Sequence, residues 1–387
     1  MEKPSRILMT ADTVGGVWSY AVDLIRALPE VQFALATMGS IITETQRDEV
    51  SCLPNVSLFP SSYALEWMDH PWEEVDRAGD WLLEIAREFK PEMVHLNGYA
   101  HAALPWKVPV LVVAHSCVLS WWSAVKKCEA PPLFDEYRRR VKAGLHSADL
   151  VIAPTRAMLD TLGENYGFYG AGRVVSNGRD AAEFRPAMKS QNIFAAGRIW
   201  DEAKNFATLA AVARRTPWPI EIAGDSADPN GRSVELKNVR SLGKLSPAEL
   251  RSRLASSAIY VLPARYEPFG LSALEAGLCE CALVLGDIGS LREVWGDAAI
   301  FIDPCDHGAL AAALNRLIND EALRVEYAQR ARTRGEHFSA TRMADGYRAM
   351  YHDCFGSSVV ACAVPQRTRQ SRFGVGPLRT TDAPARL

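Results

Sequence analysis

Short apolar runs alternate with amphipathic stretches along most of the chain. In the first half, five runs predict buried strands: RILMT (6–10), FALATM (33–38), MVHLN (93–97), VPVLVVAH (108–115) and DLVIAP (149–154). Residues 17–28 and 72–89 instead place apolar side chains at helical spacing. Strands that alternate with helices predict a parallel sheet covered on both faces.

The same alternation restarts in the second half of the chain. Five more strands are predicted: NIFAAGR (192–198), PIEIAGD (219–225), AIYVLP (258–263), CALVLGD (281–287) and AIFIDP (299–304). The segment GRVVSNGRDAAEFRP (172–186) has the Gly and Asn of a loop and ends in Pro. We therefore expect two successive α/β units joined near residues 170–190. After Phe355 the pattern ends.

Length and composition narrow the class of protein. A chain of 387 residues suits two domains, and a formal net charge of −3 gives no basis for a general affinity for nucleic acid. No apolar run approaches the roughly 18–20 residues of a spanning helix, and the first strand begins too early for a signal peptide. The eight cysteines show no zinc or redox spacing. We expect a cytoplasmic protein with reduced thiols.

The segment RYEPFGLSALEAG (265–277) holds two glutamates, which could be a catalytic pair or two unrelated surface charges. Pro268 favours an extended conformation at Glu267 and is unsuited to a helix interior. Glu267 is therefore predicted in a loop that follows a strand, and Glu275 in the helix that comes next. Their placement on separate elements argues against a direct acid–base pair.

The start of that helix, near Phe269 and Gly270, suits a bound diphosphate. Free backbone N–H groups and the helix dipole attract anions, and a glycine lets a bulky anion approach the backbone. Ligands of open parallel sheets bind outside the carboxyl ends of the strands, which is this position. We expect Glu267 beside the group attached to the diphosphate and Glu275 near a ribose. Because their spacing alone is weak evidence, two solvated charges are the alternative.

The full string EPFGLSALEA, which lies between a strand and GLCECALVLGDIGSLREV, resembles the E-x7-E signature of the family 4 (group 1) glycosyltransferases. These are retaining enzymes of the GT-B architecture, and the resemblance covers most of residues 5–355. It implies two Rossmann-like α/β domains that face each other across a cleft. The implied divisions are an acceptor-side domain at 1–170, a hinge at 171–190, a nucleotide-sugar domain at 191–336 and a helix at 337–355 that returns to the first domain. Because the alternating pattern ends after Phe355, we expect a disordered tail at 356–387.

The resemblance also implies the site residues of the second half. AAGRIWDEAKN (195–205) is similar to the family's G-R-x(3–5)-K segment, where Arg198 and Lys204 would neutralise the donor diphosphate. Backbone near Gly224 and Leu242 would border the nucleotide. The implied donor-binding residues are Gly15, Gly16, Arg198, Lys204, Gly224, Leu242, Glu267, Phe269, Gly270, Leu271, Ser272 and Glu275.

In the first half, TADTVGGVWSYAVDL (10–24) resembles the family's opening Gly-Gly loop, which would bring backbone N–H groups to the donor phosphate or the acceptor. VPVLVVAHS resembles the strand that ends in a histidine near the donor sugar, here His115. VVSNGRDAAEFRP resembles the interdomain hinge, but Arg179 occupies a site that is often apolar, and we do not expect it to touch the chemistry. The implied catalytic residues are Glu267, His115, Arg198 and Lys204.

Together these features imply a hexosyltransferase that moves a sugar from a nucleotide-diphosphate donor with retention, through an oxocarbenium-like transition state. No D-x-D stretch is present, so we expect neither a metal nor a cofactor besides the donor. The acceptor would be a carbohydrate or glycolipid in cell-surface polysaccharide or glycolipid synthesis, with Trp18, Trp121 and Trp122 either stacking on it or packing internally. Peripheral contact with the inner face of the membrane stays open. A GT-B-like nucleotide-sugar epimerase, a sugar phosphorylase and a degenerate nucleotide-sugar binding protein are the alternatives.

Overall fold

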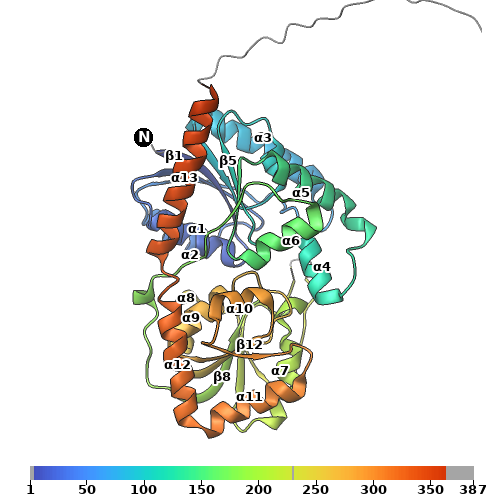
Figure 1. Ribbon diagram of the computed structural model, residues 1–387, viewed down its shortest axis with the longest axis vertical. Helices are drawn as coiled ribbons and strands as arrows, with labels where there is room; N and C mark the ends of the chain where they lie inside the picture. Colours follow the sequence, from blue (N-terminus) through green and yellow to red (C-terminus); the bar gives the residue numbers. More distant parts are fainter. Residues whose placement is uncertain (1–3, 229–230, 363–387) are drawn as a thin grey trace, which may run out of the picture.

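The computed structural model describes residues 4–228 and 231–362, of which residues 355–362 are given as backbone only. The chain forms two α/β domains, one above the other along the long axis of Figure 1. The N-terminal part builds the upper domain and the chain from β8 (Ser190–Ala196) onward builds the lower one. The long helix α13 (Ala340–Cys362) then runs back along the upper domain.

The first sheet has seven parallel strands in the order β3-β2-β1-β4-β5-β6-β7. They are β1 (Arg6–Asp12), β2 (Gln32–Met38), β3 (Val56–Pro60), β4 (Met93–Leu96), β5 (Val110–Val113), β6 (Leu150–Ala153) and β7 (Gly172–Val174). The helices of this part are α1 (Gly16–Arg26), α2 (Glu44–Ser51), α3 (Trp72–Phe89), η1 (Ala100–Ala103), α4 (Val118–Lys126), η2 (Pro132–Phe134), α5 (Asp135–Ser147) and α6 (Arg156–Tyr166). Ile7 and Met9 pack in the core that includes α1 and α13, whereas Leu8 packs in the core that includes α3 and α5. Burial on both faces explains the continuous apolar runs.

The second sheet has six parallel strands in the order β10-β9-β8-β11-β12-β13. After β8 come β9 (Ile220–Ala223), β10 (Arg240–Gly243), β11 (Ser257–Leu262), β12 (Ala282–Gly286) and β13 (Ile300–Ile302). Its helices are η3 (Ala181–Glu183), η4 (Glu202–Lys204), α7 (Phe206–Val212), η5 (Ala213–Arg215), α8 (Pro247–Ser256), α9 (Leu271–Leu278), α10 (Gly289–Trp295), α11 (His307–Asn319) and α12 (Glu321–Gly335). The expected α/β class with two parallel sheets is confirmed.

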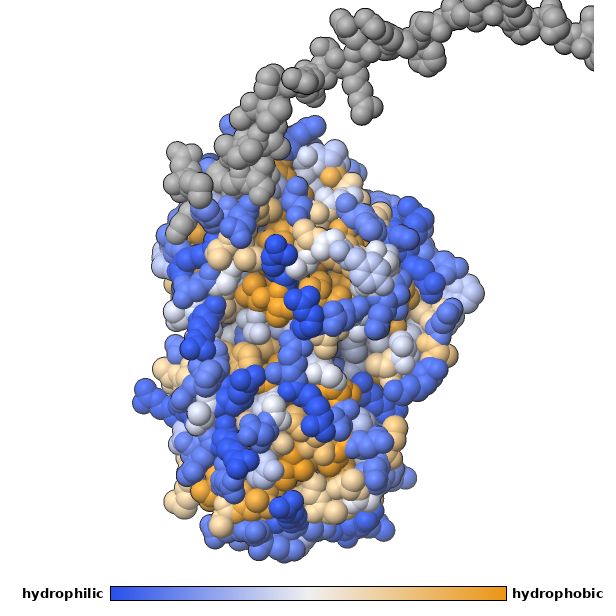
Figure 2. All heavy atoms as spheres, in the orientation of Figure 1, coloured by the Kyte–Doolittle hydropathy of each residue, from blue (hydrophilic) through white to orange (hydrophobic). Residues whose placement is uncertain are grey.

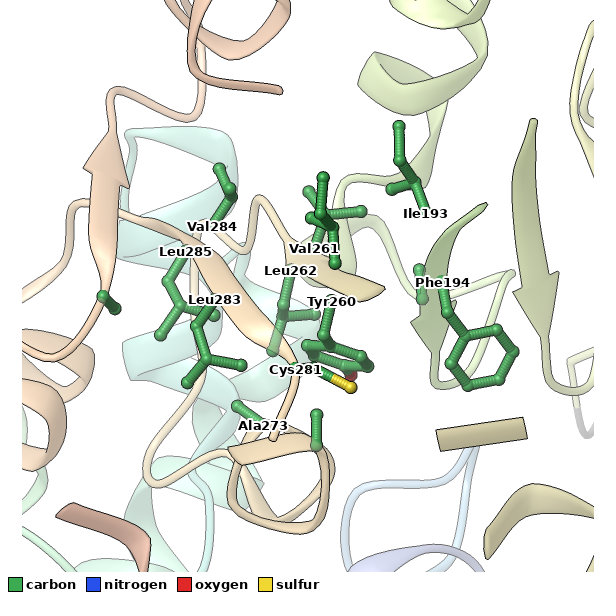
Figure 3. Close-up of a cluster of buried hydrophobic side chains, with 14 of the residues drawn as sticks. Ile193, Phe194, Tyr260, Val261, Leu262, Ala273, Cys281, Leu283, Val284 and Leu285 are labelled. Atoms are coloured by element: carbon green, nitrogen blue, oxygen red, sulfur yellow. The ribbon is translucent and has the colours of Figure 1, made fainter. Parts of the chain in front are cut away.

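The core of the second domain reaches from its sheet to the start of α9. Figure 3 shows Phe194, Tyr260 and Leu283 among the buried side chains of this core. The Tyr260 hydroxyl lies 3.2 Å from the carbonyl oxygen of Ala196 and 2.8 Å from Oγ of Ser272. Because Ser272 lies in the first turn of α9, this contact ties the helix start to the central strands.

The chain crosses between the domains twice, and the two crossings are hydrogen-bonded to each other. The N–H of Arg179 donates to the carbonyl of Phe338 at 3.0 Å, and the N–H of Ala340 donates to the carbonyl of Arg179 at 3.1 Å. A Cβ atom added to Gly178 would lie only 2.2 Å from the carbonyl oxygen of Ser339. We call residues 178–179 and 338–340 the joint. Beyond the joint, α13 packs against α1 in the core of the first domain.

Some elements differ from the sequence expectations. The pattern does not predict β3, β7 and β10, and β7 takes the first three residues of the segment expected to be a loop. The helix α13 continues beyond its predicted end at Phe355 to Cys362, so the beginning of the expected tail is helical. Its sequence carries no proline before Pro365, which removes the strongest helix breaker from this stretch. The rest of that tail, 363–387, lies outside the described residues.

In the part of the chain that the structure describes, no helix is both long enough and apolar enough to cross a membrane. Figure 2 shows hydrophilic side chains over most of one face, with hydrophobic ones gathered in an area of each domain.

Candidate active site

The loops that follow β1, β8 and β11 meet at the interface between the domains. A Cβ atom added to Gly15 would lie 3.5 Å from an Nη atom of Arg198, and one added to Gly16 would lie 3.2 Å from a methyl carbon of Leu271. Gly15 has a φ of 96°, a conformation that side-chain-bearing residues rarely adopt. The Gly-Gly loop of the first domain is therefore adjacent to both Arg198 and the start of α9.

Glu267 lies in the loop between β11 and α9, and both of its carboxylate oxygens have protein partners. Oε1 accepts a hydrogen bond from the N–H of Gly270 at 3.0 Å, and Oε2 accepts one from Nζ of Lys204. The side chains of Glu267 and Lys204 are 11% and 16% exposed. Gly270 is the N-cap of α9 with a φ of 89°. Glu267 thus caps the helix start and forms a largely buried ion pair.

Arg198 is held by a buried carboxylate, Asp201. One Nη of Arg198 donates to Oδ2 of Asp201 at 2.8 Å, and the indole N–H of Trp121 on α4 donates to Oδ1 at 3.0 Å from the other domain. Burial alone would raise the pKa of Asp201, but the charges of Arg198 and Lys204 hold it below its usual value. Asp201 therefore stays ionised between the two cations. The contact of Trp121 also shows that this side chain packs at the domain interface.

Glu275, the fifth residue of α9, is buried and contacts the joint. Nε of Arg179 donates to Oε1 of Glu275 at 2.9 Å, and a second Arg179 nitrogen contacts the same oxygen. A third nitrogen contacts Oδ2 of Asp23 on α1. Arg179, which was not expected to touch the chemistry, therefore contacts a residue that is predicted to bind the donor. The Oε2 atom of Glu275 accepts no hydrogen bond from the described residues.

His115 lies two residues beyond the end of β5, in a segment that contacts the loop carrying Glu267. Its Nε2 is 2.8 Å from Oδ1 of Asn97. Two residues later, the N–H of Cys117 donates to the hydroxyl of Tyr266 at 3.0 Å. Burial lowers the pKa of His115 to about 3, so its ring is neutral at neutral pH. The segment that carries His115 and the loop that carries Glu267 thus come from opposite domains and meet at the contact of Cys117 with Tyr266.

Asp12 ends β1 at the same interface. Its Oδ1 accepts a hydrogen bond from the N–H of Val14 at 2.6 Å. Burial raises its pKa to about 7, although this hydrogen bond and the charge of Arg198 act in the opposite direction.

Within residues 4–228 and 231–362, His, Cys, Asp and Glu side chains do not gather in groups of three or more that could hold a metal ion.

The remaining predicted residues have clear structural surroundings. A Cβ atom on Gly224 would lie 1.8 Å from the carbonyl oxygen of Gly197, so the crossing of these two backbones requires glycine there. Leu242 lies in β10, at the edge of the sheet. The ring of Phe269 packs edge to face on Phe338 in the core. Phe269 can therefore reach a ligand only through its backbone.

Several residues that contact the predicted site residues were not themselves predicted from the sequence. Asp201 lies inside the G-R…K segment, three residues after Arg198, and that spacing is a signal for an ion pair at a helical turn. Asn97 follows β4 as His115 follows β5, and β4 and β5 are paired. Their shared edge of the sheet could have suggested the contact. Arg179 was visible only as a departure from the family pattern.

Comparisons with protein families cover most of both domains. A model described as glycosyl transferases group 1 matches residues 181–334, and one described as glycosyltransferase family 4 matches residues 14–183. The glycogen synthase of Mycobacterium tuberculosis is 29% identical over 290 residues, which are 67% of this chain and 68% of that protein. The phosphatidyl-myo-inositol mannosyltransferase of Mycolicibacterium smegmatis is 27% identical over 48% of this chain and 53% of that protein.

Solved structures share the fold at low sequence identity. Sucrose-phosphate synthase from Thermosynechococcus elongatus has a TM-score of 0.76 and 17% identity, over 91% of this chain and 100% of that chain. Anabaena HepE in complex with UDP-glucose has a TM-score of 0.70 and 15% identity, over 92% of this chain and 99% of that chain. These similarities establish the arrangement of two Rossmann-like domains.

Proposed function

We propose, from the premise that this chain belongs to the group 1, family 4 glycosyltransferases, that it is a retaining, metal-independent hexosyltransferase with a nucleotide-diphosphate sugar as donor. The family match supports sugar transfer from such a donor. The observation that carries the finer proposal is that Arg198 and the start of α9 meet the Gly-Gly loop of the other domain, with the Glu267–Lys204 ion pair in the adjoining loops. The acceptor is proposed to be a carbohydrate or a glycolipid.

Breaking the bond between sugar and diphosphate leaves negative charge on the diphosphate. Groups that are already aimed at this charge lower the barrier, because they need no rearrangement. Asp201 fixes Arg198, and Glu267 fixes Lys204. An ammonium has three donors, so Lys204 retains two for phosphate oxygens after its contact with Glu267. The N–H groups at the start of α9 add a positive end of a helix dipole.

The sugar would lie between Glu267 and His115. Carboxylate oxygens accept hydrogen bonds from sugar hydroxyls, and each oxygen of Glu267 keeps a lone pair beyond its protein contact. Both carboxylate oxygens of Glu267 are already engaged, one by Lys204 and the other by the N–H of Gly270. We therefore propose that Glu267 orients the sugar rather than attacking it, and that the leaving phosphate accepts the proton of the acceptor hydroxyl.

One experiment tests the donor chemistry. The chain is incubated with a panel of nucleotide sugars, and nucleoside-diphosphate release is followed over time. We expect release from at least one donor and a rate about 10²- to 10³-fold lower for Lys204→Met, because a preorganised charge is lost. The matched control is Lys142→Met, an exposed lysine on α5, which should keep the wild-type rate.

The same assay separates the finer parts of the proposal. With a donor identified, activity should persist in EDTA, and the anomeric configuration of the transferred sugar, read from its proton coupling constant, should match that of the donor. Absence of release from every nucleotide sugar would argue for a degenerate binding protein. Inversion, or loss of activity in EDTA that a divalent cation restores, would contradict the retaining or the metal-independent assignment respectively.

A further inference from the structure

We propose that Asn97 is a positioning residue that holds His115 as its Nε2–H tautomer, so that Nδ1 acts as a hydrogen-bond acceptor for a hydroxyl of the donor sugar. The inference rests on the proposed function, in which His115 faces that sugar. It assigns a role to a residue outside the motifs and gives His115 a defined chemical task.

The first step is the orientation of the Asn97 amide, which the main chain of β1 fixes. Nδ2 of Asn97 lies 2.6 Å from the carbonyl oxygen of Thr10, and the N–H of Asn97 donates to Oγ1 of Thr10 at 2.9 Å. A carbonyl oxygen can only accept a hydrogen bond, so the amide NH2 group must face Thr10. A flipped amide would set two oxygens against each other at this distance. Oδ1 of Asn97 therefore faces away from β1.

The second step follows from this orientation. Oδ1 of Asn97 is 2.8 Å from Nε2 of His115. An amide oxygen only accepts, so the hydrogen of this bond belongs to Nε2. Burial keeps the pKa of His115 near 3, and a neutral imidazole carries a single ring hydrogen. Nδ1 is consequently unprotonated, and its lone pair has no hydrogen-bond partner among the described residues.

The third step is the position of the ring. His115 is partly exposed at the end of β5. The ring of Tyr20 on α1 holds it edge to face, with 4.5 Å between ring centroids. The contact of Cys117 with Tyr266 ties the segment to the loop of Glu267. Nδ1 of His115 and the carboxylate of Glu267 would therefore offer acceptors from opposite domains, which matches the hydroxyl donors of a sugar.

The alternative tautomer carries a cost. With its hydrogen on Nδ1, His115 would present a donor to the sugar, and Nε2 and Oδ1 of Asn97 would face each other as two acceptors. Leaving such groups unpaired in a largely buried place is unfavourable. Without an acceptor at position 97, both tautomers would be populated and fewer molecules would present the right ring nitrogen.

The test reads the tautomer directly. The full chain is labelled with 15N-histidine, long-range 1H–15N spectra are recorded at about pH 8, and the His115 signals are assigned from their loss in His115→Gln. We expect the hydrogen on Nε2. In Asn97→Leu, which lacks an acceptor, we expect a mixed tautomer and a kcat/KM for nucleoside-diphosphate release about tenfold lower, the effect of one lost hydrogen bond.

A second variant tests whether Asn97 sets the tautomer of His115 or only supports the surrounding fold. Asn97→Asp loses the bond to Thr10 but keeps an oxygen that faces Nε2, so it should keep the wild-type tautomer and exceed Asn97→Leu in kcat/KM. The control is Asn165→Leu on α6, whose amide donates to Thr161 and Ser120, and it should leave the tautomer unchanged. If Asn97→Leu does not fold, the wild-type and Asn97→Asp spectra still decide.

Three outcomes overturn the proposal: a hydrogen on Nδ1 of His115 in the wild-type chain, an Asn97→Leu variant with wild-type tautomer and kcat/KM, or an Asn97→Asp variant with the mixed tautomer expected of Asn97→Leu. The spectra need no turnover. Should the wild-type chain show the expected tautomer but release nucleoside diphosphate from no nucleotide sugar, the proposed function fails while the tautomer assignment stands.

Discussion

Asp12 couples the stability of the chain to pH. Burial raises its pKa from 3.8 to about 7. Between about pH 4 and pH 7 the folded chain therefore binds a proton that the unfolded chain has lost, and this carboxyl makes the folded state less stable as pH rises through that window. Asp12→Asn keeps an oxygen for the N–H of Val14 but cannot ionise.

We expect Asp12→Asn to gain stability over the wild-type chain at about pH 8 and to gain much less at about pH 4.5, where the wild-type carboxyl is protonated in the folded state. Urea midpoints of both chains at the two pH values check this. Equal differences at both values would show that Asp12 ionises normally in the folded chain.

Some residues of the candidate site could be identified from the sequence alone, because they lie close together in the chain. Glu267, Gly270 and Glu275 stand in one string whose proline and glycine already separate loop from helix. The pairing of Arg179 with Glu275 joins residues far apart in the chain, and no local pattern reports a contact of this kind. The catalytic and donor-binding roles of the string remain predictions.

At the scale of elements, α4 of the first domain contacts η4 of the second through two polar pairs. The indole N–H of Trp121 donates to Asp201, and Nζ of Lys126 pairs with Glu202 at 2.7 Å. Asp201 also binds Arg198, which is proposed to bind the donor. The position of α4 therefore affects the position of Arg198.

Trp121→Phe keeps an aromatic ring but removes the N–H. One hydrogen bond to a charged group contributes about 1.5 kcal/mol or more, so we expect a donor KM about tenfold higher. The measurement is nucleoside-diphosphate release at varied donor concentration. Trp106→Phe is the control, because Trp106 also donates one hydrogen bond, to the carbonyl of His101. An equal rise in KM for both variants would mean that Trp121 acts only through general stability.

Element prediction succeeded where burial is strong and failed at three of the four edge strands, β13 being the exception. The amphipathic pattern at 72–89 gives α3 with the same bounds, and the central strands appear as apolar runs. The missed strands β3, β7 and β10 all lie at sheet edges and are only partly buried. A strand with one open edge needs little apolar sequence, so its pattern does not distinguish it from a loop.

At the scale of the whole molecule, the joint holds the two domains in register. A Cβ atom on Gly178 would meet a main-chain oxygen of the other crossing, so the backbones of the joint would have to separate. We expect Gly178→Ala to lower the free energy of unfolding by about 1–3 kcal/mol, as other overpacked sites do. Urea unfolding measures this change.

The control for this variant is Gly289→Ala in α10. A Cβ atom there would have its nearest neighbour at 3.7 Å, an ordinary contact. Its free energy of unfolding should stay within about 0.5 kcal/mol of the wild-type value. If Gly178→Ala is equally neutral, the joint is not the tight contact described above.

Paired crossings on one side of the protein give it the mechanics of a lever with a fixed fulcrum. Figure 1 shows α13 on the side of the joint and α4 on the opposite side. A rotation about the fulcrum moves nearby atoms least, so the ion pairs of Arg179 with Asp23 and Glu275 can persist while the contact of Trp121 with Asp201 breaks. The interface would then open on the side of α4 and stay closed at the joint, so that access to the loops between the domains depends on a contact far from the crossings.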